Sequence, residues 1–297
     1  MTPETRRYYA SHSIESDPGD LRALLDALPC DPAPLLAAVG ALVLHAAFVG
    51  PLGVVCPPES ADDREVRHMP MMLSRILARD ARPLSTARAP EHRFIGVCRH
   101  YALLACSALR HHGVPARVRV GFANYFEPGF YDDHWVTEYW DGSSWRLMDA
   151  ELTPGVRRHF GITFDPYDVP RDRFVTAGTA WLGVRCGRID SATCGVSTVN
   201  ITGTWFVGGS VVRDLAALNK REMMPWDYWG IARSLRAGVD MTEATAARID
   251  GVATLIAGDD PDWKAVRDTY DNDDGLRVPG TVMSFPKNVP TEVTVGL

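Results

Sequence analysis

The order of apolar and polar positions predicts one helix and three strands in the middle of the chain. Apolar residues recur at helical spacing over residues 98–112, and a glycine and a proline within residues 113–115 end that helix. Residues 116–122 alternate arginine with apolar side chains, which is typical of a half-buried strand. Residues 134–140 and 144–148 are rich in strand-forming side chains and predict a hairpin with a short turn.

Three side chains suited to thiol chemistry lie at the ends of these elements. Cys98 falls in the first helical turn, where unpaired backbone N–H groups and the helix dipole favour a thiolate, and Gly96 allows a sharp turn just before it. His134 begins the second strand and Asp149 ends the third, so the hairpin would bring the two together. A thiol that attacks, an imidazole that moves the proton and a carboxylate that orients the imidazole make a nucleophilic triad.

A second interpretation of the same residues is structural. A cysteine in an apolar helix is often a small buried side chain, and Cys106 fits that description well. His134 and Asp149 would then be a cap and a turn residue. The placement of all three at a helix start, a strand start and the facing end of the hairpin favours the catalytic interpretation.

At this point the chain resembles a known family. The motifs GVCRHYA and GVPAR within residues 96–117, followed by Asp133-His134-Trp135 and by Asp149, are similar to the core of the transglutaminase-like superfamily. The resemblance covers about residues 90–170. More loosely, residues 205–230 are similar to the tail of uncharacterised bacterial members.

The resemblance implies an α+β fold of the papain-like type, in which a helix bearing the cysteine packs on an antiparallel sheet. It also implies that Cys98 is the nucleophile, His134 the general base and acid, and Asp149 the orienting carboxylate. The superfamily includes protein cross-linkers, peptidases, amidases, amide-forming enzymes and members without catalysis, so the fold leaves the reaction open.

The flanks of this core are expected to be helical. We expect a helical region over residues 1–88, the catalytic core over 89–175, and a mainly helical region over 176–297 that packs on the core, with an irregular tail after residue 271. The apolar run at residues 34–49 is interpreted as a buried helix, because its length of about 24 Å is short of the roughly 30 Å hydrocarbon core of a membrane.

Two segments are expected to contact the substrate. The loop before His134 should rim the cleft, where its aromatic rings favour an apolar face and its acids an amine. In the tail, an arginine or asparagine could hold a carboxylate or amide beside a tryptophan wall, although an ordinary amphipathic helix has the same pattern. The expected substrate-binding residues are Tyr125, Phe126, Tyr131, Asp133, Trp135, Arg213, Asn219 and Trp226.

Composition narrows the partners. The net charge is −6 and no basic run alternates with aromatics, which disfavours nucleic-acid binding. The six cysteines show neither metal-ligand spacing nor a disulfide framework, so no metal and no cofactor is expected. The first residues, MTPETRRYYASHSIES, lack the apolar segment of a secretion signal, and a cytoplasmic protein without a membrane partner is expected.

Three functions remain open. The first is acyl transfer, in which a small or peptidic acyl donor forms a thioester on Cys98 that an amine or water then captures. The second is a peptidase or amidase with water as its sole acceptor, and the third is a silent binding module. The full set of triad residues argues against the third. The backbone N–H of Cys98 should be one oxyanion donor, and Trp135, Asn124 and His45 are candidates for the second.

Overall fold

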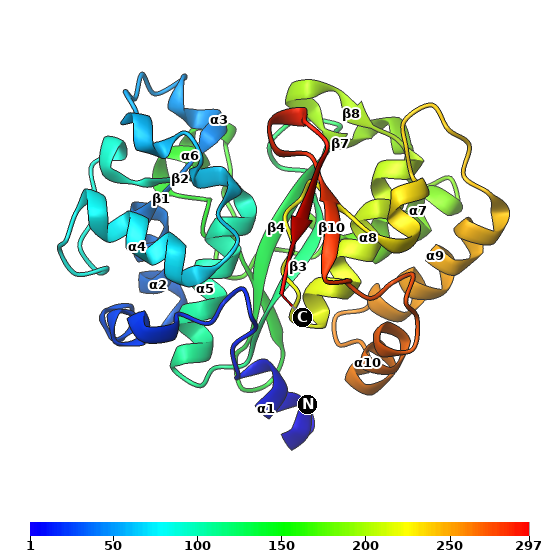
Figure 1. The fold of residues 1–297 in the computed structure, drawn as a ribbon, viewed down its shortest axis with the longest axis horizontal. Helices are drawn as coiled ribbons and strands as arrows, with labels where there is room; N and C mark the ends of the chain where they lie inside the picture. Colours follow the sequence, from blue (N-terminus) through cyan, green and yellow to red (C-terminus); the bar gives the residue numbers. More distant parts are fainter. Residues whose placement is uncertain (297) are drawn as a thin grey trace. The chain divides into compact units, whose positions relative to one another are not determined.

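The computed structural model describes residues 1–296, and the chain divides into two compact units (Figure 1). The first unit comprises Met1–Val118 and Val136–Val169, and the second comprises Arg119–Trp135 and Pro170–Leu297. The boundary between the two units cuts two strands, so each of these strands has residues in both units. These strands are β3 (Ala116–Ala123) and β4 (Tyr131–Trp140).

The first unit is mainly helical and carries the predicted nucleophile. Its elements are α1 (Pro3–Tyr9), η1 (Gly19–Ala27), α2 (Pro32–Leu42), β1 (Val43–His45), α3 (Ala46–Val49), η2 (Pro58–Ser60), η3 (Asp63–Glu65), α4 (Met69–Arg79), η4 (Pro90–His92), β2 (Phe94–Gly96), α5 (Cys98–His111), β5 (Trp145–Met148) and α6 (Pro154–Phe160). Strands β1 and β2 pair in parallel, and β5 pairs antiparallel with β4.

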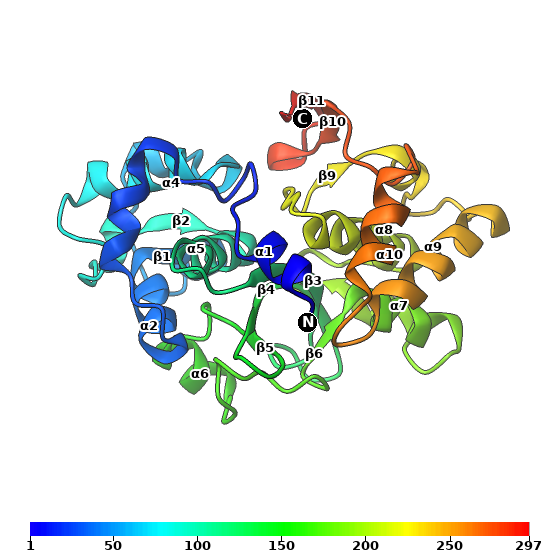
Figure 2. The ribbon, with the colours of Figure 1, turned by 90° about the horizontal axis from the view of Figure 1, so that it is seen from below.

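Helix α5 lies at the centre of the first unit, between α2 and α4 and beside β1 and β2 (Figure 2). It confirms the helix predicted over residues 98–112, but it is buried on all sides rather than on one face. Its polar side chains are buried because each has a partner. Arg110, for example, donates to the carbonyl of Ala116 at 3.0 Å and to the hydroxyl of Ser16 at 2.9 Å. The sequence of such a helix is amphipathic, because it contains arginines, but the helix is buried in the core since each arginine has a hydrogen-bond partner.

The second unit joins part of the sheet to a helical cluster. Its elements are β6 (Phe174–Thr176), α7 (Ala177–Arg185), η5 (Ser191–Thr193), β7 (Cys194–Val196), η6 (Ser197–Val199), β8 (Ile201–Thr202), α8 (Thr204–Leu218), β9 (Asp227–Tyr228), η7 (Gly230–Ser234), α9 (Glu243–Ile256), α10 (Trp263–Asp271), β10 (Thr281–Ser284), η8 (Pro286–Asn288) and β11 (Thr291–Thr294). The strand order is β6-β3-β4-β7-β8, and β11-β10-β9 form a separate sheet.

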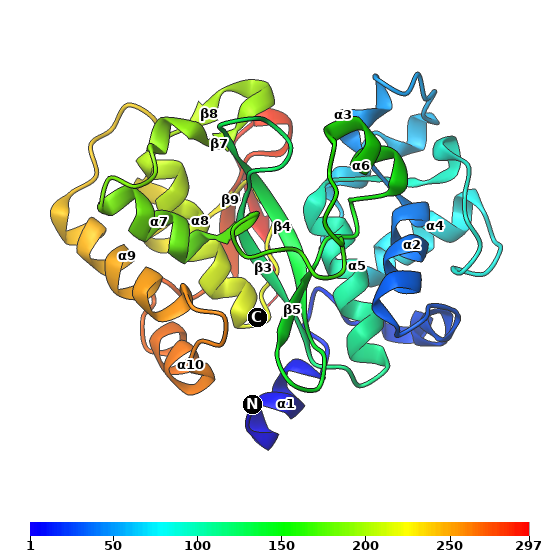
Figure 3. The same ribbon diagram turned by 180° about the vertical axis from the view of Figure 1, so that it is seen from behind.

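Helices α7, α8 and α9 pack side by side in the second unit (Figure 3). Their apolar core includes Trp181, Val211 and Ile249, each fully buried. A buried ion pair anchors α8 to the sheet, because Arg119 on β3 donates to Asp214 at 2.9 Å. Asp214 also accepts the backbone N–H of Val120 at 2.8 Å, so this carboxylate holds both the side chain and the backbone of β3.

Several predicted elements differ from the structure. The single helix expected over residues 34–49 is interrupted by β1, whose backbone pairs with β2 instead of continuing the helix. The tail expected to be irregular after residue 271 contains β10 and β11, which pair antiparallel from Thr281 with Thr294 to Ser284 with Thr291. In the first case pairing with a distant strand overrides local helix propensity. In the second case β10 pairs with its neighbour β11 and also with the distant strand β9.

No single helix within residues 1–296 is long and apolar enough to cross a membrane, although the pair Gly19–Ala27 and Pro32–Leu42, bent by 118°, passes on length and composition together. The region boundaries near residues 88 and 175, and the packing of the tail on the core, stay predictions.

Candidate active site

Cys98 is the first residue of α5, as predicted, and only 6% of it is exposed. The residue before it, Val97, is extended and begins the helix without a capping side chain of its own. The cap comes instead from the third helical residue. The backbone N–H of Val97 donates to Nδ1 of His100 at 3.1 Å, and Nε2 of His100 lies 2.9 Å from the carbonyl of Val66.

These two contacts fix the protonation state of His100. A ring nitrogen that accepts an N–H carries no proton, so the proton is on Nε2 and donates to Val66. The ring is fully buried, and burial, assisted by the positive charge of Arg99, lowers the pKa of His100 to about 3. The neutral imidazole therefore acts as the helix cap. By holding the backbone of Val97, it fixes the position of Cys98, the next residue.

Strand β2, which leads into Cys98, is held on both sides. Gly96 is opposite His45 on β1, and a Cβ on Gly96 would lie 3.0 Å from Cβ of His100 and 3.1 Å from a methyl group of Val43. Close packing, rather than a sharp turn, therefore explains this glycine. One residue earlier, the backbone N–H of Ile95 donates to Asp63 at 2.9 Å.

Asp63 is a fully buried carboxylate with two cationic partners. Nη1 of Arg75 lies 3.0 Å from Oδ1 and Nη1 of Arg79 lies 2.5 Å from Oδ2. Arg79 also donates to the carbonyl of Arg93 at 2.9 Å. Charge-assisted hydrogen bonds of this kind are stronger than neutral ones, so α4 and η3 hold the strand that precedes Cys98.

His134 lies on β4 in the second unit and is 2% exposed. Three aromatic rings surround its imidazole edge to face, with centroids 5.1 Å away for Phe126, 6.0 Å for Tyr125 and 6.4 Å for Phe174. Tyr125 and Phe126, expected to contact the substrate, therefore pack against the predicted base. This aromatic shell restrains the orientation of the imidazole.

Asp149 follows β5 in the first unit and is 1% exposed. Its Oδ1 accepts the backbone N–H of Glu151 at 3.0 Å, and its own N–H donates to Pro166 at 2.7 Å. In the hairpin, Thr137 of β4 is opposite Met148, the last residue of β5, so Asp149 comes directly after this pair. The carboxylate is thus buried and fixed by its own turn, which is what an orienting carboxylate requires.

The tail residues predicted to contact substrate have structural contacts. Asn219 ends α8, where its amide donates to the carbonyl of Leu215 at 2.8 Å and its oxygen accepts from Arg267 at 3.3 Å. The backbone carbonyl of Trp226 accepts a hydrogen bond from the N–H of Phe285 at 3.1 Å, next to the β9–β10 pair. Tyr131 packs against the apolar core of the second unit.

The three candidates for a second oxyanion donor differ in the hydrogen bonds that their side-chain nitrogens make. Nδ2 of Asn124 donates to the carbonyl of Asp172 at 2.7 Å. Within residues 1–296, the buried Nε1 of Trp135 has no hydrogen-bond partner. Nδ1 of His45 accepts the N–H of Ala47 at 3.1 Å, which places the proton of the neutral ring on Nε2. His45 is thereby a donor on the strand next to β2.

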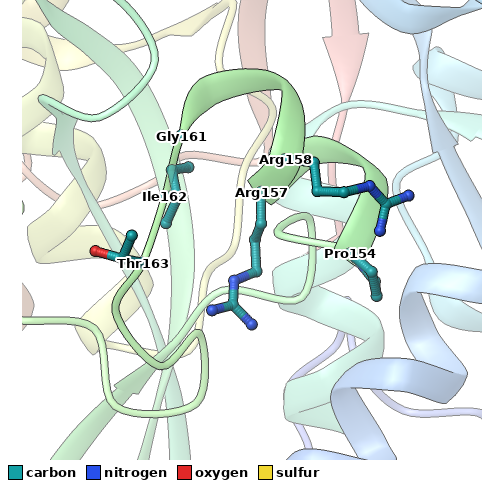
Figure 4. Close-up of a pocket in the computed structure, with 6 residues that line it drawn as sticks. All are labelled: Pro154, Arg157, Arg158, Gly161, Ile162 and Thr163. Carbon is teal, nitrogen blue, oxygen red and sulfur yellow. The ribbon is translucent and has the colours of Figure 1, made fainter.

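One surface pocket of the first unit is lined by α6 and the residues that follow it. It has a volume of about 400 Å³ and is lined by Pro154, Arg157, Arg158, Gly161, Ile162 and Thr163. Figure 4 shows the two guanidinium groups pointing in different directions, so they do not converge on one anion. Within residues 1–296, no group of three or more His, Cys, Asp or Glu side chains is placed to hold a metal ion.

Comparison with known proteins agrees with this geometry. Residues 66–150, which include β2, α5 and the β4–β5 hairpin, match the model of the transglutaminase-like superfamily. This segment is a transglutaminase-like core. The chain therefore has the α+β class of fold expected from its sequence, but its main sheet is mixed rather than antiparallel, because β7 pairs in parallel with β4. The match over residues 66–150 supports a cysteine-dependent enzyme in general terms.

A solved structure from Cytophaga hutchinsonii, of a proposed cysteine protease, is similar at 18% identity and a TM-score of 0.21. The match covers 53% of this chain and 46% of that protein, so the chain spans less than half of its length. No curated protein matches the sequence.

Sequence reasoning missed the residues that position Cys98. His100 lies at the third helical position, where a Glu or Gln commonly reaches back to the cap, and this spacing was the available signal. Asp63 gave no such signal, because its partners Arg75, Arg79 and Ile95 are 12 to 32 residues away.

Proposed function

We propose that the chain is a cysteine-dependent acyl-transfer enzyme in which Cys98, His134 and Asp149 act together on a small or peptidic substrate. The observation that carries the proposal is the position of Cys98 as the first residue of α5, within the segment that matches the transglutaminase-like superfamily. Backbone N–H groups of a first helical turn have no partner in their own helix, so they favour a thiolate and an oxyanion at this place.

The proposed reaction has two halves. The thiolate of Cys98 attacks the carbonyl carbon of an amide, ester or thioester, the C–S bond forms, and the bond to the leaving group breaks as His134 gives that group a proton. An amine or water then attacks the thioester carbonyl while His134 takes its proton. The C–S bond breaks, the sulfur leaves as a thiolate, and His134 keeps the proton, which restores the starting thiolate–imidazolium pair. Asp149 holds the imidazole in the orientation that both halves need.

We further propose that His45 donates the second hydrogen bond to the oxyanion. Support comes from its position opposite Gly96, two residues before Cys98, and from the proton that its contact with Ala47 places on Nε2. A donor from outside helix α5 complements the backbone N–H of Cys98, because the N–H groups of one helix turn point along one axis.

Product analysis separates acyl transfer from hydrolysis. A small activated ester is supplied as the acyl donor, with increasing hydroxylamine as the amine, and the hydroxamate and free acid are both measured. Acyl transfer predicts hydroxamate that rises with amine concentration at the expense of acid. Acid alone, at all amine concentrations, would assign the chain to the hydrolases. Cys98→Ala should abolish both products, and Cys106→Ala, which changes a buried cysteine on the same helix, should abolish neither. Turnover unaffected by Cys98→Ala would refute the proposal.

A further inference from the structure

A buried cation and a buried carboxyl oxygen of the second unit have unfilled hydrogen-bonding capacity. Arg213 on α8 is 1% exposed, and its Nη2 donates to the hydroxyl of Ser210 at 3.2 Å. In the part of the chain that the structure describes, its buried Nε and Nη1 have no hydrogen-bond partner. Oδ1 of Asp133 on β4 is also buried without one. Buried polar groups are nearly always paired, so these atoms indicate a ligand.

The guanidinium of Arg213 is held in place rather than loose. Its central carbon lies 5.4 Å from the ring centroid of Tyr228 and 5.6 Å from that of Phe206, both within cation–π range. Gly209, one turn earlier on α8, has no side chain beside the group, and a Cβ there would lie 3.4 Å from Nη1. The two rings and Ser210 therefore fix the orientation of the group and leave two of its nitrogens available.

The charge on Asp133 is set by its surroundings. Burial raises the pKa of Asp133 to about 6, whereas the positive charge of Arg213 and the neighbouring His134 favour the ionised form and Asp132 opposes it. Near neutral pH the site thus holds one positive and one negative group. Either group would lose solvation without gaining a partner if a neutral molecule filled the site.

We propose that Arg213 and Asp133 bind a small zwitterion, a molecule with a carboxylate and an ammonium group on one carbon, such as a free amino acid. One oxygen of the carboxylate accepts from an unpartnered N–H of Arg213, and the ammonium donates to Oδ1 of Asp133. Successive residues of a strand point to opposite faces, so Asp133 leaves β4 on the side opposite His134 and its aromatic shell. The zwitterion site is therefore distinct from the proposed triad, and its occupancy does not depend on thioester chemistry.

Calorimetric titration tests the site with four probes of similar size. Glycine carries both charges, acetate only the carboxylate, methylammonium only the amine, and acetamide neither. At pH 7.5 glycine should bind at least about tenfold more tightly than the other three, because it alone compensates both groups. Glycine affinity should fall as pH drops below about 6, where Asp133 takes up a proton. Equal affinity for acetamide, or no saturable heat with glycine, would overturn the proposal.

Two variants separate loss of the site from loss of the fold. Arg213→Gln should weaken glycine binding by about tenfold or more, whereas Arg233→Gln, an exposed arginine of the same unit, should not change it. Asp133→Asn keeps the shape and removes one charge, so glycine should bind more weakly and acetate more tightly than to the unaltered protein. Such a reversal cannot come from misfolding. If neither Arg213→Gln nor Asp133→Asn changes the affinity for glycine, the proposed zwitterion site is refuted.

Discussion

The imidazole of His100 accepts the backbone N–H of Val97 at 3.1 Å and thereby fixes the residue that precedes Cys98. This contact requires a neutral ring, and the other ring nitrogen is already committed to the carbonyl of Val66. Cys98 is thus positioned by a buried, uncharged histidine rather than by a Ser, Thr or Asp cap. The arrangement makes the start of α5 sensitive to acid.

The first prediction concerns stability against pH. The pKa of His100 is lowered to about 3 in the folded chain, mainly by burial, and is about 6.5 when unfolded. Between these values the unfolded chain binds the proton and the folded chain does not, so stability is complete above about pH 6.5 and falls toward pH 3. The loss between pH 7 and pH 4 should be up to about 3 kcal/mol from this residue.

Urea unfolding at several pH values measures this loss, and His100→Gln is the matched variant. Glutamine can accept the same N–H and does not titrate, so the variant should lose less stability on acidification. His12, whose pKa burial lowers to about 4, acts in the same direction in both proteins and cancels in the comparison. Identical pH profiles for the two proteins would contradict the role of His100.

The elements around Cys98 could be predicted because their signals are local. The helix start at Cys98, the glycine and proline that end it, and the turn Asp141-Gly142 each follow from neighbouring residues, and the β4–β5 hairpin is confirmed. Gly142 has a φ of 106°, which only glycine adopts readily. The glycine in the sequence therefore indicated the turn for a conformational reason.

The rest could not be predicted because it depends on distant partners. β1 exists through pairing with β2, about 50 residues later, although its sequence continues an apolar helix. Arg119 alternates with apolar residues and reads as solvent-facing, but it is buried by Asp214, 95 residues away. The residues of a segment alone do not show which distant residue it will contact in the folded chain, so burial that depends on such a contact cannot be predicted from them.

A second prediction concerns the carboxylate that holds β2. Asp63→Asn should lower the free energy of unfolding by about 3–5 kcal/mol, because it leaves the buried Arg79 without its counter-charge. Denaturant unfolding measures the change. Asp17→Asn, at an exposed pair with Arg22 in the same unit, should cost less than about 1 kcal/mol. Comparable losses in the two variants would show that Asp63 does not anchor the strand.

A third prediction concerns thiol reactivity. Iodoacetamide should label Cys98 before Cys30, Cys56, Cys106 and Cys194, because a helix start favours the thiolate. Burial raises the pKa of Cys194 to about 12, which makes it the slowest of these. Cys186 is a competitor, because a hydrogen bond from the backbone of Arg188, assisted by its side chain at 3.0 Å, lowers the pKa of this exposed thiol.

The labelling is therefore measured by peptide mapping in a Cys186→Ser background. Modification of Cys106 ahead of Cys98 would move the nucleophile off the helix start.

A fourth prediction separates the oxyanion donors. His45→Ala should slow ester turnover by about 10²–10³-fold, because one donor to the oxyanion is lost. Alkylation of Cys98 by iodoacetamide forms no oxyanion and should keep its rate. Trp135→Phe, which removes the unpartnered Nε1, should slow turnover much less. If Trp135→Phe shows the large loss and His45→Ala does not, the second donor is the indole.

The central claim is that Cys98 forms an acyl-thioester with the help of His134 and Asp149, and intact-mass spectrometry tests it most directly. Brief incubation with an activated ester, quenched in acid, should add the mass of one acyl group, mapped to the peptide that carries Cys98. The adduct should be absent in Cys98→Ala and His134→Ala. In Asp149→Asn it should form about 10⁴-fold more slowly, with thermal stability retained. An acyl group found on another residue, or an adduct that forms at full rate without His134, would contradict the account.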